Sequence, residues 1–172
     1  ESIMEIVKVL AFEDQVEFTH YVVKMSQGKG QFRLLSVDLI LMLMTTLRDP
    51  LGLDSGDKVE NLWGLTCLET LIERCSDVTA GIKARALTNL AQVVGFFSGN
   101  NRSRTLLKEV MGFGNEGLSS TKCRMNDLLL KRCMDEKAAV RKAALFLISK
   151  LTVLLRGALD GELLKIVGMA CS

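Results

Sequence analysis

Apolar residues recur at spacings of three and four in several separate stretches of the chain, which is the pattern of a buried stripe along an amphipathic helix. The clearest stripe consists of Val140, Ala143, Ala144, Leu147, Leu151, Leu154 and Leu155. A second stripe consists of Ile82, Ala86, Leu90, Val94 and Phe97. A helix that precedes the second stripe is marked by Leu62, Leu65, Leu68 and Leu71 with Ile72, and one that precedes the first is marked by Leu128, Leu129 and Cys133. The pattern predicts pairs of helices.

The turns between paired helices repeat in sequence. Arg74-Cys75-Ser76-Asp77 in one turn corresponds to Arg132-Cys133-Met134-Asp135 in another, and a weaker copy begins at Met25-Ser26-Gln27. Cys171-Ser172 matches the same register, and we expect it to open a further turn. Because one helix pair cannot bury both of its apolar faces alone, neighbouring pairs must stack. The sequence predicts an all-α fold, an α-solenoid of about four repeats including partial ends.

The repeat resembles the HEAT family, whose helix pairs carry an Asp in the turn and a basic residue early in the second helix. Here Asp77 and Asp135 are the turn residues, and the basic residues are Arg33, Lys83 and Arg141. The first copy departs from the family pattern, because Gln27 stands where Asp is expected. A turn carboxylate can accept hydrogen bonds from free amides and pair with a cation of the same or the next repeat. We therefore expect a ladder of ion pairs that holds the repeats in register.

Residues 1–172 are predicted to be a single HEAT-type segment of a longer chain, since the sequence begins at Glu1 without a Met. Two insertions, 47–61 and 98–121, interrupt the period and are rich in turn-forming residues. We expect them to be the main functional loops. Within the second, Thr105 to Met111 is predicted to form a short helix.

Composition supports a folded helical protein. Hydrophobic residues make up 48% of the chain and charged residues 24%, which excludes a disordered segment. Lys and Arg total 22 and Asp and Glu total 20, but the charges are unevenly placed: the net charge is −4 up to Asn100 and +6 beyond it. The basic part is open to two interpretations, an unevenly charged solvated surface or a contact for phosphate or an acidic partner.

Cysteine and histidine usage argues against a metal site or a disulfide framework. The five Cys include no CxxC pair, and His20 is the single His, so four clustered zinc ligands are not available. The turn residues Cys75, Cys133 and Cys171 are expected to be small buried residues, and Trp63 and five methionines are expected to pack in the core. These methionines are Met25, Met42, Met44, Met125 and Met134. A reducing compartment fits this usage best.

Membrane and catalytic signals are weak. The longest apolar run, Leu39 to Met44, is six residues, too short to span a bilayer. Gly112 to Gly117 spells G-x-G-x-x-G, but no strand precedes it, as a dinucleotide site requires. The carboxylates at 13, 14 and 17 lie at a helix start, where they offset the macrodipole. We expect no catalytic, cofactor or metal site and no small-molecule substrate.

Particular stretches resemble one subfamily, the CAP-D-type HEAT-repeat subunits of condensin II. They are Tyr21–Lys29, Arg33–Ile40, Asp49–Gly52, Arg74–Asp77 and Ala84–Leu87. The resemblance implies a nuclear, chromosome-associated scaffold without enzymatic activity. It implies binding to a kleisin and to other condensin subunits, and contact with chromatin DNA in mitotic chromosome condensation.

Two other functions remain open at this point. One is a karyopherin-like transport or adaptor protein that binds peptides. The other is a HEAT-like DNA-processing enzyme, which would need a Trp, Tyr and Asp cluster on the second helices. The residues we expect to contact DNA or a partner are basic and lie early in second helices or in the second insertion: Lys83, Arg85, Arg102, Arg104, Lys108, Lys122, Arg124, Arg141 and Lys142.

Overall fold

The structure is a computed structural model that describes residues 3–53, 63–113, 119–155 and 168. For residues 119–124 it describes the backbone only. Over these residues every regular element is a helix. The elements are α1 (Ile3–Lys8), α2 (Phe12–Met25), α3 (Gly30–Thr46), α4 (Trp63–Arg74), α5 (Ala80–Phe97), α6 (Asn101–Val110), α7 (Ser119–Cys133) and α8 (Ala138–Leu154). The predicted all-α class is therefore confirmed.

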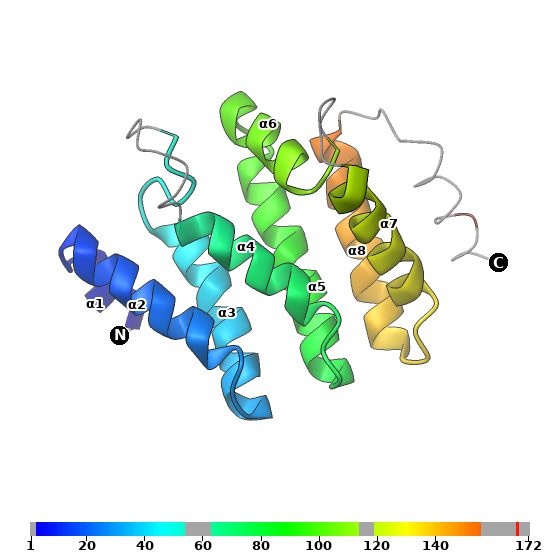
Figure 1. Ribbon diagram of the computed structural model, residues 1–172, viewed down its shortest axis with the longest axis horizontal. Coiled ribbons are helices and arrows are strands. Elements are labelled where there is room, and N and C mark those ends of the chain that lie inside the picture. Colours follow the sequence, from blue (N-terminus) through cyan, green and yellow to red (C-terminus); the bar gives the residue numbers. More distant parts are fainter. Residues whose placement is uncertain (1–2, 54–62, 114–118, 156–167, 169–172) are drawn as a thin grey trace.

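The helices form two layers, as Figure 1 shows. The first helices of the pairs, α2, α4 and α7, lie side by side in front of the second helices α3, α5 and α8. Each first helix packs on its own second helix, and the second helices pack on one another in the order α3, α5, α8. This stacking of helix pairs is the predicted solenoid.

The predicted stripes form the core. Leu90, Val94, Leu147 and Leu151 are fully buried between α5 and α8, the most extensively packed pair of helices. A buried Leu or Val side chain contributes about 1.5–3 kcal/mol relative to an exposed one, so this seam is a large part of the stability. A polar contact joins α3 to α5 as well: buried Asn89 donates from Nδ2 to the carbonyl of Val37 at 3.0 Å.

The repeated cysteines occupy equivalent places. Cys75 follows α4 and Cys133 ends α7, and both side chains are buried. Burial raises the pKa of the Cys75 thiol far above its ordinary value, although the charge of Arg132 partly opposes the shift. Burial also raises the pKa of Cys67 to about 12. These thiols are packing residues, as the repeat predicts.

The methionine prediction is only partly right. Met44 and Met125 are buried, but Met42 is 37% exposed and Met134 is 66% exposed, so core packing is wrong for these two. Met134 stands in the turn between α7 and α8, whereas Met42 lies on the exposed face of α3. Trp63 is 5% exposed and packs in the core as predicted.

The described parts of both insertions are more ordered than simple surface loops. The described part of the first insertion packs inward, with Leu47 and Leu51 in the core and the amide of Gly64 donating to the carbonyl of Pro50 at 3.1 Å. In the second, α6 begins at Asn101 rather than at Thr105. The earlier start has a local cause, because Oδ1 of Asn100 accepts the amide of Arg102 at 2.8 Å and caps the helix.

The described residues contain three helix pairs, α2–α3, α4–α5 and α7–α8, with α1 and α6 as additional helices. The predicted partial repeat that includes Cys171-Ser172 lies outside the described residues, as do 54–61 of the first insertion and 114–118 of the second. Among the helices described, none is both long enough and apolar enough to cross a bilayer.

Candidate functional site

Asp77 is the centre of the first inter-repeat contact. Its carboxylate, 1% exposed, accepts from Nε and Nη2 of Arg33 in the preceding pair at 2.8 and 3.2 Å. It also accepts from Nη1 of Arg74, three residues earlier, at 3.1 Å. The amide of Thr79 donates to Oδ1 at 2.9 Å and so closes the turn before α5. One buried carboxylate thereby joins α3, α4 and α5.

Asp135 repeats this arrangement one pair later. Its Oδ2 accepts from Nζ of Lys83 on α5 at 2.5 Å and from Nη1 of Arg132 at 3.3 Å. The amide of Lys137 donates to Oδ1 at 3.0 Å. Each aspartate thus binds one cation of the preceding second helix, one arginine near the end of its own first helix, and one amide of its own turn.

Both carboxylates have a lowered pKa. Burial alone would raise the pKa of Asp77, but the hydrogen bonds from Arg33 and the Thr79 amide and the charges of Arg33 and Arg74 outweigh it. For Asp135 the hydrogen bond from Lys83 is the main cause of the lowered pKa. Both groups are therefore ionised at neutral pH, and the expected ladder of ion pairs is present in two consecutive repeats.

Four of the predicted contact residues lie at the turn edge, the edge of the solenoid where the turns join first to second helices. Lys83 is mostly buried, with 14% of its side chain exposed, and its charge is paired with Asp135. Arg85 is 55% exposed and lies 3.7 Å from a carboxylate oxygen of Asp38. Arg141 and Lys142 are exposed on α8. Of these four, Lys83 is the one that the ladder already uses.

A second group of the predicted residues lies on α6, at the opposite end of α5. Arg102 is exposed and Lys108 is half-buried. Arg104 donates to the carbonyl of Ser98 and to the side chain of Asn101, so it supports the α5–α6 corner. Since α5 is 18 residues long, about 27 Å separates the two groups, and the structure does not bring them together. The side chains of Lys122 and Arg124 lie outside the described part.

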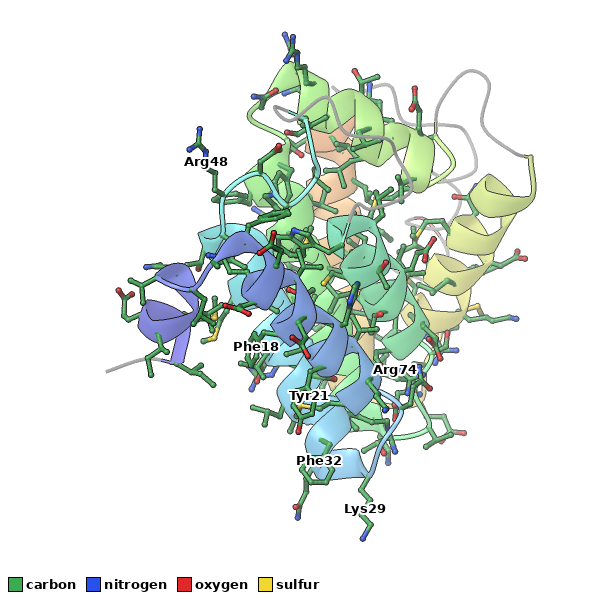
Figure 2. The ribbon with its side chains drawn as sticks, turned by 60° about the vertical axis from the view of Figure 1, so that its left-hand side comes forward. Phe18, Tyr21, Lys29, Phe32, Arg48 and Arg74 are labelled. Atoms are coloured by element: carbon green, nitrogen blue, oxygen red, sulfur yellow. The ribbon has the colours of Figure 1, made fainter. Side chains whose placement is uncertain are left out.

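Sequence reasoning missed two cations at the turn edge. Lys29 and Lys137 are the N-cap residues of α3 and α8, and both are exposed. Lys29 points away from the body of the protein at the lower end of α3 (Figure 2). Both could have been predicted from the sequence as surface cations of this edge, since each is a basic residue directly before a predicted second helix. Together with the N-termini of α3, α5 and α8 they make this edge electropositive.

Sequence reasoning also missed an exposed aromatic patch on the second helices. Phe96 of α5 is 58% exposed and Phe146 of α8 is 38% exposed. Lys150 lies between the two helices, because its aliphatic stem packs against Gly95, the residue before Phe96, and its Nζ lies 5.2 Å from the centre of the Phe146 ring. We call Phe96, Phe146 and Lys150 the aromatic–lysine patch. Exposed apolar residues beside a cation are suited to a partner segment that carries apolar and acidic side chains.

A shallow groove of about 450 Å³ lies between the two turns and is lined in part by Lys83, Arg132 and Asp135. These three groups are bound to one another in the ladder. A paired carboxylate with a lowered pKa is a poor general base, and a paired lysine is a poor nucleophile. The charged groups that line the groove are therefore suited to holding the two helix pairs together and poorly suited to catalysis.

Comparison with known proteins supports the resemblance. The chain is 52% identical over its whole length to the condensin-2 complex subunit CAP-D3 of Arabidopsis thaliana. It spans about 13% of the length of that protein. No family model and no solved structure matches the chain.

Proposed function

We propose that the chain is part of a non-enzymatic subunit of a condensin II complex, which acts in the nucleus on chromosomes. The observation that carries the proposal is the 52% identity to a condensin-2 subunit over the entire chain. The ladder supports a scaffold role, because its charged groups are used to hold helix pairs in register. The partners that follow from this proposal are a kleisin, other condensin subunits and DNA.

For the kleisin contact we propose the aromatic–lysine patch. Phe96 and Phe146 expose rings on neighbouring helices, and such rings are frequent hot spots of protein interfaces. Exposed Leu35 of α3, 48% accessible, extends the apolar character of the second helices. A kleisin segment with apolar and acidic side chains fits this chemistry.

The test is co-purification of the kleisin with the full-length subunit that contains this chain. The double variant Phe96→Ser and Phe146→Ser should reduce recovery of the kleisin about tenfold or more. Val78→Ser is the matched control, because Val78 is 92% exposed but lies on a turn away from the patch. Equal losses from both variants would argue that exposed apolar residues in general, and not this patch, hold the partner.

For DNA we propose the turn edge as the main contact. It combines the N-termini of α3, α5 and α8 with the exposed cations Lys29, Arg85, Lys137 and Lys142. Backbone amides and cations are the groups that bind phosphates without reading sequence. The α6 cations Arg102 and Lys108 form a second candidate contact.

Duplex DNA binding measured over a range of salt concentrations tests this assignment in the full-length subunit. Reversing the charge of Arg85, Lys137 and Lys142 to Glu should weaken binding and lower the salt slope by about 3, since each lost phosphate contact removes about 0.9. Reversing exposed Lys8 and Arg48 is the control, because Lys8 ends α1 and Arg48 follows the opposite end of α3 from the turn edge. A loss confined to the variant with Arg102→Glu and Lys108→Glu would move the contact to α6.

A peptide-transport protein is the second candidate function, favoured by the same exposed aromatic patch. Binding of transport-signal peptides in place of the kleisin would support it. A DNA-processing enzyme is less compatible with the geometry, because Trp63 is 5% exposed in the core and Tyr21 is exposed on the first helix α2 (Figure 2). Neither is available to press a base against the second helices.

A further inference from the structure

Two apolar side chains project from the turn edge into solvent. Val78, in the turn before α5, is 92% exposed, and Met134, in the turn before α8, is 66% exposed. Both line the shallow groove between these two turns. They contribute little to folding, because an apolar side chain stabilises a protein by being removed from water. A pair of such side chains on one groove is a candidate contact surface, and we call Val78 and Met134 the apolar tips.

The repeat itself does not require apolar residues at these positions. Gly28 and Glu136 stand at the position of Val78 in the turns on either side. Ser76 stands at the position of Met134 in the turn before it. The apolar tips are therefore a feature of these two turns, whereas the aspartates beneath them belong to the general repeat.

Backbone hydrogen bonds fix the apolar tips before any partner binds. The amide of Thr79, directly after Val78, donates to Oδ1 of Asp77 at 2.9 Å. The amide of Met134 itself donates to the carbonyl of Leu130 at 3.2 Å. A segment that is already ordered loses little conformational entropy when it enters a partner. The two turns are thus suited to act as rigid wedges.

The surroundings of the apolar tips favour DNA over a protein partner. The three turns between paired helices lie in a row along the lower edge of Figure 1, and exposed Lys29 and Lys137 stand on the same edge. Helices α3, α5 and α8 each begin there without a side-chain hydrogen bond at the N-cap, so their first amides are open to phosphates. The groove itself contains Asp135 and Glu136, and we expect phosphates on the rim cations and not inside it.

We propose that Met134 and Val78 enter the minor groove of duplex DNA held on the turn edge and bend the duplex. This inference rests on the DNA contact proposed above for that edge. Apolar side chains that enter between base pairs partly unstack them and kink DNA by about 20–90°. Packed helices such as α5 and α8 lie about 8–10 Å apart, and base pairs rise by about 3.4 Å, so the apolar tips are spaced for steps about three base pairs apart. Flexible pyrimidine–purine steps are the preferred sites, because they cost least to kink.

The experiment measures the bend by energy transfer between fluorophores at the two ends of a duplex of about 30 base pairs, bound to the full-length subunit that contains this chain. The natural subunit should bring the ends closer together. The variant with Val78→Thr and Met134→Gln keeps the size of both side chains and should lose most of the bend. Its salt slope should stay unchanged, since no phosphate contact is removed. Met134→Leu should retain the bend.

A matched control is available on α1. Ile6 is 62% exposed, and Val9, directly after the helix, is 82% exposed. Both precede α2 and so lie at the opposite end of that helix from its turn. The variant with Ile6→Thr and Val9→Thr removes two exposed apolar side chains away from the turn edge, and it should bend DNA as the natural subunit does.

A duplex that is already kinked by an unpaired bulge gives a second readout. It should bind the natural subunit about tenfold tighter than a straight duplex, because the cost of unstacking is already met. The variant with Val78→Thr and Met134→Gln should bind both duplexes about equally. This comparison needs no fluorophores on the DNA ends and is independent of the bending measurement.

The outcomes separate this inference from the proposed function. Unchanged bending in the variant, or binding at the turn edge without a bend, overturns the inference alone. If charge reversal of Arg85, Lys137 and Lys142 leaves DNA binding intact, the turn edge is not the DNA contact, and that assignment fails together with the inference. If the variant bends DNA normally but loses another subunit of the complex on co-purification, the apolar tips contact protein and the inference is again overturned.

Discussion

Removal of the Asp77 carboxylate is the sharpest perturbation of the ladder. Asp77→Ala deletes the acceptor of three hydrogen bonds from Arg33 and Arg74 and of one from the Thr79 amide. The two guanidinium groups, 18% and 13% exposed, would remain at the joint without their counter-charge. Removing one partner of a buried ion pair costs about 3–5 kcal/mol.

The measurement is urea unfolding followed by circular dichroism. With a urea dependence of about 2 kcal/mol per molar, the midpoint of Asp77→Ala should fall by about 2 M. Asp135→Ala should cost less, about 2–3 kcal/mol, because its rung is more exposed and has one hydrogen bond fewer. Asp14→Ala, in the exposed first turn of α2, is the control and should cost at most about 1 kcal/mol.

A double-mutant cycle shows whether the loss comes from the ladder. Arg33→Ala should be costly in the natural chain and nearly neutral in the Asp77→Ala background, because its charged partner is already gone. The reasoning is refuted if Asp77→Ala is no more destabilising than Asp14→Ala. It is equally refuted if Arg33→Ala costs the same in both backgrounds.

Three further predictions concern stability. The pKa values of Asp77 and Asp135 are lowered by folding, so the difference in unfolding free energy between the natural chain and Asp77→Asn should be constant above about pH 5 and shrink as the pH falls below about 4; a difference that grows on acidification would contradict the sign. Ser26→Ala should stabilise by about 1 kcal/mol in thermal unfolding, because the hydroxyl of Ser26 is buried without a hydrogen-bond partner in the described part of the protein. Gly64→Ala should destabilise by about 1–3 kcal/mol, since its Cβ would overlap the carbonyl of Pro50, whereas Gly81→Ala on α5 meets open space and should be neutral or stabilising.

The repeat architecture could be predicted from local signals. The spacing of Ile82, Leu90 and Val94 is a property of one helix, and that helix forms where the spacing places it. Turn aspartates and early basic residues were visible as a recurring pattern, so the ladder could be expected before its geometry was known. Asn100 shows the limit of such signals, because its capping bond moved the start of α6 ahead of the predicted position.

Which cation pairs with which aspartate in the ladder is decided by the three-dimensional structure. The sequence allowed Lys83 to be a phosphate contact or a ladder cation, and its 2.5 Å contact with Asp135 shows where its charge is used. The exposed Phe96 and Phe146 belong to helices whose buried faces were correctly predicted, yet the position of Lys150 between Gly95 and the Phe146 ring depends on how α5 packs on α8. Whether a side chain is exposed depends on how a neighbouring helix packs, and the residue pattern of its own helix carries no information about that packing.

Helix formation, pairing of helices and the position of the turns were thus already encoded in the linear order of residues, because apolar periodicity and turn chemistry act over a few residues. The grouping of cations from separate helix pairs along one turn edge was decided by the tertiary structure. Lys29, Arg85 and Lys142 are far apart in the chain, and the stacking of α3, α5 and α8 brings them to the same edge of the protein. Their common position is set by the packing of whole helices, and no residue carries it locally.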